Sequence, residues 1–176
     1  MIISKKKIQY FLLPISLILI LSLSRLIPHP YNFTPILAVG IFSGYYFKNF
    51  ILSSFIVISS MAIGDLFLGF HNTMFFTYAS LAVAVSFGIM IKKFNFPEIL
   101  LSGLLGSIVF FVVTNFGSWI FLDMYEKNFS GLLQSYLLAI PFFHNTLIST
   151  LLYLTVLKLV FDYAEKKKII KLQFEI

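Results

Sequence analysis

Residues 50–70 read FILSSFIVISSMAIGDLFLGF, an apolar run with one charged residue, Asp65, inside it. A helix of about 20 apolar residues crosses the hydrocarbon core of a bilayer. The chain as a whole is also apolar: its 176 residues are 59% hydrophobic and 11% charged, with a mean hydropathy of +0.95. Soluble domains carry roughly 25% charged residues. The composition therefore predicts an integral membrane protein with a single domain.

Six apolar runs predict six transmembrane helices in an all-α bundle. They cover residues 8–27, 33–47, 50–70, 73–91, 97–122 and 131–161. The second run is short for a full crossing. The last is too long for one straight crossing, so we expect Pro141 to divide it into a shallow outer piece and a spanning helix that begins at this proline.

The two ends of the chain have their own expectations. The first run is interpreted as a retained helix, because it is longer than the apolar part of a signal peptide and no cleavage motif follows it. Residues 1–162 then form one transmembrane domain. The basic tail, residues 163–176, is expected to lie as an amphipathic segment on the cytoplasmic surface of the membrane.

The basic residues predict the orientation of the helices. With six crossings, the ends and loops alternate between two sides, and every Lys and Arg except Arg25 and Lys127 falls on the side of both termini. The positive-inside rule places that side in the cytoplasm, as in a multi-pass protein of the bacterial inner membrane. This topology and anionic lipid headgroups explain the net charge of +6, so no nucleic-acid partner is expected.

Polar residues gather in the outer half of the predicted bundle. An interhelical hydrogen bond contributes only about 0.6 kcal/mol in membranes, so stability alone does not explain this one-sided distribution. An outward-facing cavity with a few polar groups in apolar and aromatic walls does explain it. In that cavity Arg25 and Asp65 would supply charges, the Asn and Thr residues donors and acceptors, and Trp119 a stacking wall. The candidate substrate-binding residues are Arg25, Asn32, Asp65, Thr114, Asn115, Trp119, His144 and Asn145.

Several of these candidates have a second interpretation. Arg25 and Asp65 are expected at a similar depth, and an ion pair between them would tie two helices together without any ligand. Trp119 is explained equally well as part of the aromatic belt at the outer interface. If all the polar residues are interhelical ties, the chain is a non-transporting membrane scaffold.

The sequence contains no pattern typical of catalysis, nucleotide binding or metal binding. It has no Cys and no HExxH, GxSxG or Walker motif. Its three His residues lack the spacing of a helical pair of metal ligands. We therefore expect no enzyme activity, no metal and no cofactor, and a chain that does not itself drive transport with ATP.

Four stretches resemble a family of small bacterial membrane proteins to which transport is ascribed: RLIPHPYNFTPILAVGIFSG (25–44), GDLFLGFH (64–71), TNFGSW (114–119) and GLLQSYLLAIPFFHNT (131–146). That family is considered similar to the substrate-binding S components of energy-coupling factor (ECF) transporters. The resemblance implies an S-component-like bundle, a vitamin-like small-molecule substrate, and an ECF-type membrane subunit with ATPases as a partner. S components often present an AxxxA pattern to that partner, whereas the small residues of the first helix here are Ser16, Ser22 and Ser24.

Overall fold

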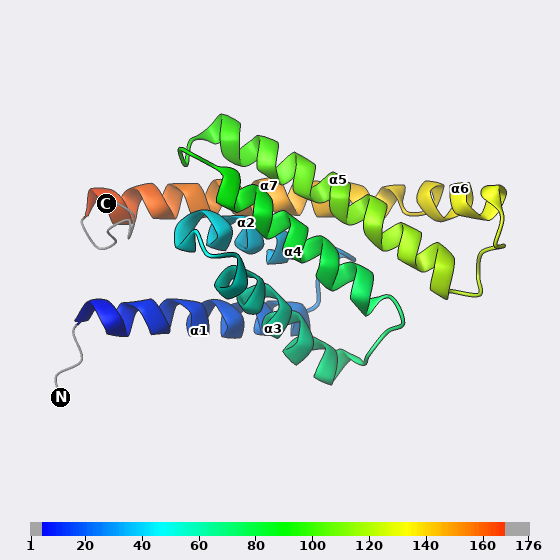
Figure 1. Cartoon of the computed structure of the whole chain (residues 1–176), viewed down its shortest axis with the longest axis horizontal. Helices are drawn as coiled ribbons and strands as arrows, with labels where there is room; N and C mark the ends of the chain where they lie inside the picture. The colour runs from blue at the N-terminus through cyan, green and yellow to red at the C-terminus, as the bar shows by residue number, and fades with distance from the viewer. Residues whose placement is uncertain (1–4, 168–176) are drawn as a thin grey trace.

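The computed structural model describes residues 5–167, with side chains from residue 12 onward, and this part of the chain is entirely helical (Figure 1). Three of its helices, α3, α5 and α7, are each long and apolar enough to cross a membrane, while the apolar parts of α1, α2 and α4 are shorter. The all-helical structure of the described residues and these three apolar helices confirm the prediction of an all-α membrane protein. The helices are α1 (Lys5–Leu26), α2 (Ile36–Phe47), α3 (Phe50–Leu68), α4 (Met74–Met90), α5 (Phe96–Phe121), α6 (Phe129–Leu137) and α7 (Ile140–Lys166).

Three helices begin at an asparagine that caps them. The side chains of Asn49, Asn95 and Asn128 accept hydrogen bonds from backbone N–H groups in the first turns of α3, α5 and α6. Such a cap satisfies one of the N–H groups that the first turn leaves without an intrahelical acceptor. These asparagines define the starts of three helices more sharply than the apolar pattern does.

The last apolar run is divided as predicted. α6 ends at Leu137, and α7 begins at Ile140 with Pro141 in its first turn, where proline needs no N–H donor. α7 continues to Lys166, so the expected boundary after residue 162 falls inside this helix. The remainder of the expected surface-lying tail, residues 168–176, lies outside the described residues.

α2 is the central helix of the bundle. All twelve of its residues are buried, and α3, α4, α5 and α7 pack around it. α4 approaches most closely, because a Cβ on Gly44 would lie 2.3 Å from the carbonyl oxygen of Val85, and one on Gly88 would lie 1.9 Å from that of Ile41. Only glycine permits this separation of the two backbones. α1 lies at the edge and packs against α3 (Figure 1).

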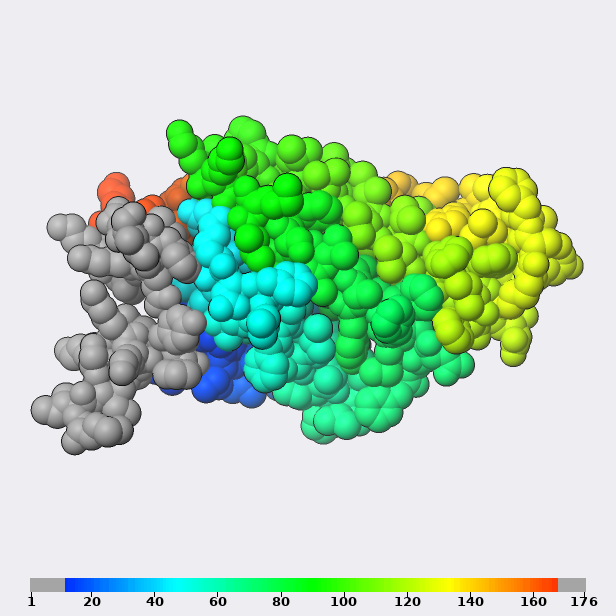
Figure 2. All heavy atoms as spheres, in the orientation of Figure 1, coloured from blue at the N-terminus to red at the C-terminus, as the bar shows by residue number. Residues whose placement is uncertain are grey.

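The helix ends and connections are sorted between the two ends of the molecule. The Lys5 end of α1, the Lys166 end of α7 and the α2–α3 and α4–α5 connections lie at one end, which we call the basic end (left in Figure 1). The α1–α2, α3–α4 and α5–α6 connections lie at the other, which we call the loop end. Figure 2 shows α6 and the α5–α6 connection (yellow) projecting beyond the other helices at the loop end.

Aromatic side chains fill the interior at the basic end. Tyr45 of α2 and Phe94 of the α4–α5 connection stack with their ring centroids 4.5 Å apart, and the ring of Phe161 from α7 lies 5.3 Å from that of Phe94. Lys48 covers this cluster, with its Nζ 4.9 Å from the centre of the Tyr45 ring and donating to the carbonyl oxygen of Ile89 at 2.8 Å. The basic end is therefore closed by packed side chains.

Candidate functional site

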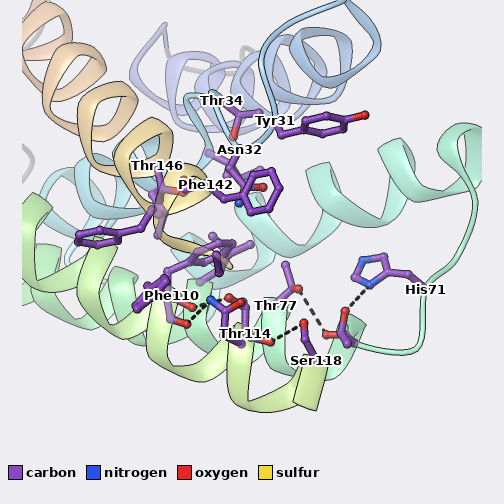
Figure 3. A pocket seen from close by; sticks show the side chains of 18 of the residues that line it. Tyr31, Asn32, Thr34, His71, Thr77, Phe110, Thr114, Ser118, Phe142 and Thr146 are labelled. Atoms are coloured by element: carbon purple, nitrogen blue, oxygen red, sulfur yellow. Dashed lines mark hydrogen bonds between the residues drawn. The ribbon is translucent and has the colours of Figure 1, made fainter. Parts of the chain in front are cut away.

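A cavity of about 770 Å³ lies at the loop end of the bundle (Figure 3). Its volume falls within the range of small-molecule sites. Figure 3 shows Asn32 and Thr34 across the cavity from Thr114 and Ser118. All three connections of the loop end contribute to the lining, with His29, Tyr31, Asn32 and Thr34 from the first, His71, Asn72 and Thr73 from the second, and Leu122, Met124 and Tyr125 from the third.

The cavity exists because α2 is too short to fill the bundle. Its twelve residues extend for only about 18 Å, whereas the 19 residues of α3 extend for about 28 Å. The first two residues of α2, Ile36 and Leu37, line the floor of the cavity together with Leu81 of α4. The neighbouring helices continue past this point and become the walls, so the missing turns of α2 leave the space that a ligand could occupy.

The segment between α1 and α2 descends into the bundle along α7. The Asn145 side chain donates to the carbonyl oxygen of Tyr31 at 2.9 Å, and the Ser149 hydroxyl donates to that of Asn32 at 3.5 Å. One turn further along α7, the ring of Tyr153 lies 6.2 Å from that of Phe33. The segment is thus held by α7 on one side and lines the cavity on the other.

The walls combine aromatic rings with hydroxyl and amide groups. The rings of Phe111 and Phe143 lie 4.9 Å apart on one side, and those of Tyr31 and Phe142 meet edge to face at 6.0 Å. Most wall hydroxyls donate back to their own helices, as the Thr114 hydroxyl does to the carbonyl oxygen of Phe110 at 2.7 Å. Each of these hydroxyl oxygens keeps its capacity to accept a hydrogen bond. The side chains of Asn32, Thr34 and Asn72 make no hydrogen bond within the described part of the chain.

Four of the eight candidate residues line this cavity: Arg25, Asn32, Thr114 and Asn115. The Asn115 amide donates to the carbonyl oxygen of Phe111 at 2.8 Å, which leaves its own oxygen as an acceptor. Asn32 has a φ of 60°, a left-handed conformation that asparagine tolerates better than most residues, and it turns the chain toward the start of α2. The structure thus brings together residues from α1, α5 and the first connection.

Asp65 lies directly behind the cavity wall rather than in it. Its Oδ1 accepts from Nη2 of Arg25 at 2.7 Å, and its Oδ2 accepts from the Tyr78 hydroxyl at 2.6 Å. The Asp65 side chain is 1% exposed and that of Arg25 is 14% exposed. Nη1 of Arg25 also donates to the carbonyl oxygen of Met61 at 2.8 Å. Both interpretations of the pair therefore apply, since Arg25 borders the cavity while it ties α1 to α3.

The other three candidates lie outside the lining. Trp119 donates from its indole N–H to the carbonyl oxygen of Glu126 at 2.9 Å, and Lys127 donates to the carbonyl oxygen of Trp119 at 2.5 Å. His144 is exposed on α7. Asn145 holds the descending segment through Tyr31. The contacts of Trp119 and Asn145 hold the connections that surround the cavity.

Two residues at the site are not among the candidates predicted from the sequence. Tyr78 lies four residues inside the start of α4, and Asp65 lies three residues before the end of α3, so equal depth on adjacent helices could have paired them. Thr150 lines the cavity from α7, and its Oγ1 is buried without a hydrogen-bond partner in the described part of the chain. Hydroxyl residues are frequent in apolar helices, so no sequence signal distinguishes it.

No group of three or more His, Asp or Glu residues close enough to hold a metal ion occurs among residues that the structure describes. In the first connection, Nδ1 of His29 lies 2.8 Å from the carbonyl oxygen of Pro30, and in the second, Nδ1 of His71 lies 2.9 Å from the Thr73 hydroxyl. What the lining offers a ligand is hydrogen bonds, one guanidinium group and apolar contact.

Comparison with curated proteins and with solved structures found no significant match to this chain. Comparison with protein families did find one, which covers residues 5–172 and so includes every helix and the whole cavity. The chain therefore belongs to the Family of unknown function (DUF6580).

Proposed function

We propose that this protein binds a small molecule from the outer side of the bacterial inner membrane for uptake. The observation that carries the proposal is the cavity of about 770 Å³ at the loop end, combined with aromatic packing that closes the basic end. A site that is open on one side and closed on the other suits a protein that captures its substrate before passing it inward.

The topology follows from the same two ends. In this proposal α1 to α5 and α7 are six crossings, and the basic end faces the cytoplasm with both termini. The described cations of the loop end are only Arg25 and Lys127, and Arg25 is paired with Asp65, so the positive-inside rule favours this orientation. The short α2 is compatible with a crossing because the descending segment before it completes the path.

The mode of action resembles that of an ECF S component. The sequence has no nucleotide-binding motif, so a membrane subunit with ATPases would supply the energy for release on the inner side. A vitamin-like molecule is the expected class of substrate by that resemblance. The aromatic walls and scattered hydrogen-bonding groups support a substrate with an apolar body and a few polar substituents.

A scaffold without transport activity is the second candidate. The observation that favours it is that Asp65 and Asn145 have protein partners and act as ties between elements. Such ties hold a bundle together whether or not a ligand binds. The scaffold accounts less well for the side chains of Asn32, Thr34 and Asn72, which line the cavity and make no hydrogen bond within the described residues.

Cysteine labelling tests the proposal, because the natural chain has no Cys. Thr114→Cys places one thiol in the cavity, and Asn95→Cys places one at the basic end. In intact cells a membrane-impermeant maleimide should label Thr114→Cys, whereas Asn95→Cys should react only after permeabilisation. Labelling of Asn95→Cys alone in intact cells would reverse the orientation and refute the proposal.

The second stage of this experiment separates uptake from the scaffold. Vitamins and other metabolites of similar size are screened for protection of Thr114→Cys against the maleimide. A protecting compound should also be taken up in its radiolabelled form by cells that carry the protein, and more slowly by cells that lack it. If the thiol is accessible from outside but no compound protects it, the scaffold is the better account.

A further inference from the structure

The N-terminus of α2 is uncapped and opens on the cavity. The first hydrogen bond of this helix joins the N–H of Val39 to the carbonyl oxygen of Pro35, so the N–H groups of Ile36, Leu37 and Ala38 have no acceptor in the described structure. No side chain caps the helix. Unlike most helix N-termini this one is buried within the bundle, and its first two residues line the cavity.

A second polar group without a partner lies in the same lining. Thr150 is fully buried on α7, and its Oγ1 has no hydrogen-bond partner in the described part of the chain. The neighbouring Ser149 donates to the carbonyl oxygen of Asn32, four residues before the start of α2, so this part of α7 lies beside the segment that leads into the helix. Buried polar groups usually have partners, and one that lines a cavity is available to a ligand.

Among the described residues, the lining of the cavity includes the guanidinium group of Arg25 and no Asp or Glu, while the carboxylate of Asp65 lies behind the wall and pairs with Arg25. Arg25 uses one N–H of its guanidinium on Met61 and one on Asp65, which leaves further donors of its five. The positive end of the α2 dipole also faces the cavity, in a medium of low dielectric constant. The lining is therefore rich in donors and contains no carboxylate among the described residues.

We propose that the ligand carries an oxyanion, either a carboxylate or a phosphate group, which binds the free N–H groups of α2 with Thr150 beside them. The remainder of the ligand lies against Phe110, Phe111 and Phe142. Backbone N–H groups at a helix N-terminus bind such anions in many proteins, and discontinuous helices in membranes present them at mid-depth. The inference rests on the proposed function, since it names the chemical class of the molecule that occupies the same cavity.

A series of naphthalene compounds that differ only in one substituent tests the charge. The purified full-length protein in a non-ionic detergent is titrated calorimetrically with 2-naphthoate, 2-naphthyl phosphate, 2-naphthamide and 2-naphthylmethylammonium. Both anions, or one of them, should bind about 10-fold more tightly than the amide, as expected for one hydrogen bond to a charged group. The difference between the two anions distinguishes a carboxylate site from a phosphate site.

A matched pair of variants tests the location. Ile36→Asp places a carboxylate at the first residue of α2, where its negative charge repels an incoming anion. Ile36→Asn has the same size without the charge. The preference for anions should disappear in Ile36→Asp and persist in Ile36→Asn. Thr150→Val, which removes only the hydroxyl, should weaken anion binding several-fold and leave binding of the amide unchanged.

The outcomes separate this inference from the proposed function. If the four compounds bind equally, or the ammonium binds best, and Thr114→Trp abolishes binding by filling the cavity, the oxyanion is wrong and the cavity remains a binding site. A preference for anions that survives in Ile36→Asp refutes the location at α2. If none of the four compounds binds, the inference fails, and the proposed function is decided separately by the protection of Thr114→Cys.

Discussion

Removal of one partner from the Arg25–Asp65 pair should destabilise the protein more than removal of both. The pair joins α1 to α3 at 2.7 Å, and Asp65 is 1% exposed. Arg25→Ala leaves a buried carboxylate with Tyr78 as its remaining polar partner, and Asp65→Ala leaves an uncompensated guanidinium. In the double variant neither charge remains, so most of the cost of each single change should disappear.

The structure also predicts the size and order of these effects. Loss of one partner of a buried ion pair costs about 3–5 kcal/mol. Arg25 borders the cavity and is 14% exposed, so water can solvate it when Asp65 is removed, whereas Asp65 has no such access. Arg25→Ala should therefore be the more damaging single change. Tyr78→Phe should cost about 1.5–3 kcal/mol by itself, because it removes a hydrogen bond to a charged group, and almost nothing when Asp65 is already Ala.

The assay is reversible unfolding in mixed micelles of increasing sodium dodecyl sulfate content, followed by circular dichroism. Arg25→Ala, Asp65→Ala and their double variant give one cycle, and Tyr78→Phe with Asp65→Ala gives a second. We expect a coupling free energy of about 2–3 kcal/mol in the first cycle. Additive losses in both cycles would show that the three side chains do not interact and would refute the described network.

Three further predictions concern topology, packing and the two amides. A reporter active only outside the cytoplasm should be silent when fused to the C-terminus, and activity there would exclude six crossings with a cytoplasmic N-terminus. Gly88→Ala should lower the melting temperature strongly, because its Cβ would lie 1.9 Å from a backbone oxygen of α2. Gly40→Ala is the control and should be tolerated, because its Cβ would lie 3.4 Å from the nearest side-chain atom. Equal melting temperatures of the two variants would contradict the close approach of α2 and α4. Asn115→Ala should weaken ligand binding about 5- to 150-fold at an unchanged melting temperature. Asn145→Ala should instead lower the melting temperature, because its amide holds the segment before α2. If Asn145→Ala weakens binding and Asn115→Ala lowers the melting temperature, then Asn145 is the binding residue and Asn115 the structural one.

The helices were predictable because their signals are local. Runs of apolar residues set their number, and Pro141 indicated the break between α6 and α7. The start of α2 was placed three residues too early, at residue 33 rather than at Ile36. Phe33 is apolar and extends the run, but the chain there is descending toward Pro35, and apolar composition does not distinguish a helix from a covered extended segment.

The sequence predicted how deep the candidate residues lie in the bundle, but not which way their side chains point. Polarity and helix direction place Asn115 and Asn145 in the same half of the bundle, yet one side chain lines the cavity and the other supports a loop. Which way a helix is rotated depends on all its neighbours. The small hydrogen-bonding groups of this site are also common in the interior of any membrane bundle, so Thr150 became apparent only from its missing partner.

The burial of α2 on every side bears on how the chain is inserted during synthesis. A segment of twelve apolar residues is short for recognition as a spanning helix by the translocation machinery, and only Lys48 and Asn49 separate it from the longer α3. We expect the two to enter the bilayer together as a hairpin, with α3 as the inserting partner. α2 then remains without its full packing until α7, the last of the described helices, has left the ribosome. Nascent chains that stop before α7 should therefore be substrates for membrane proteases.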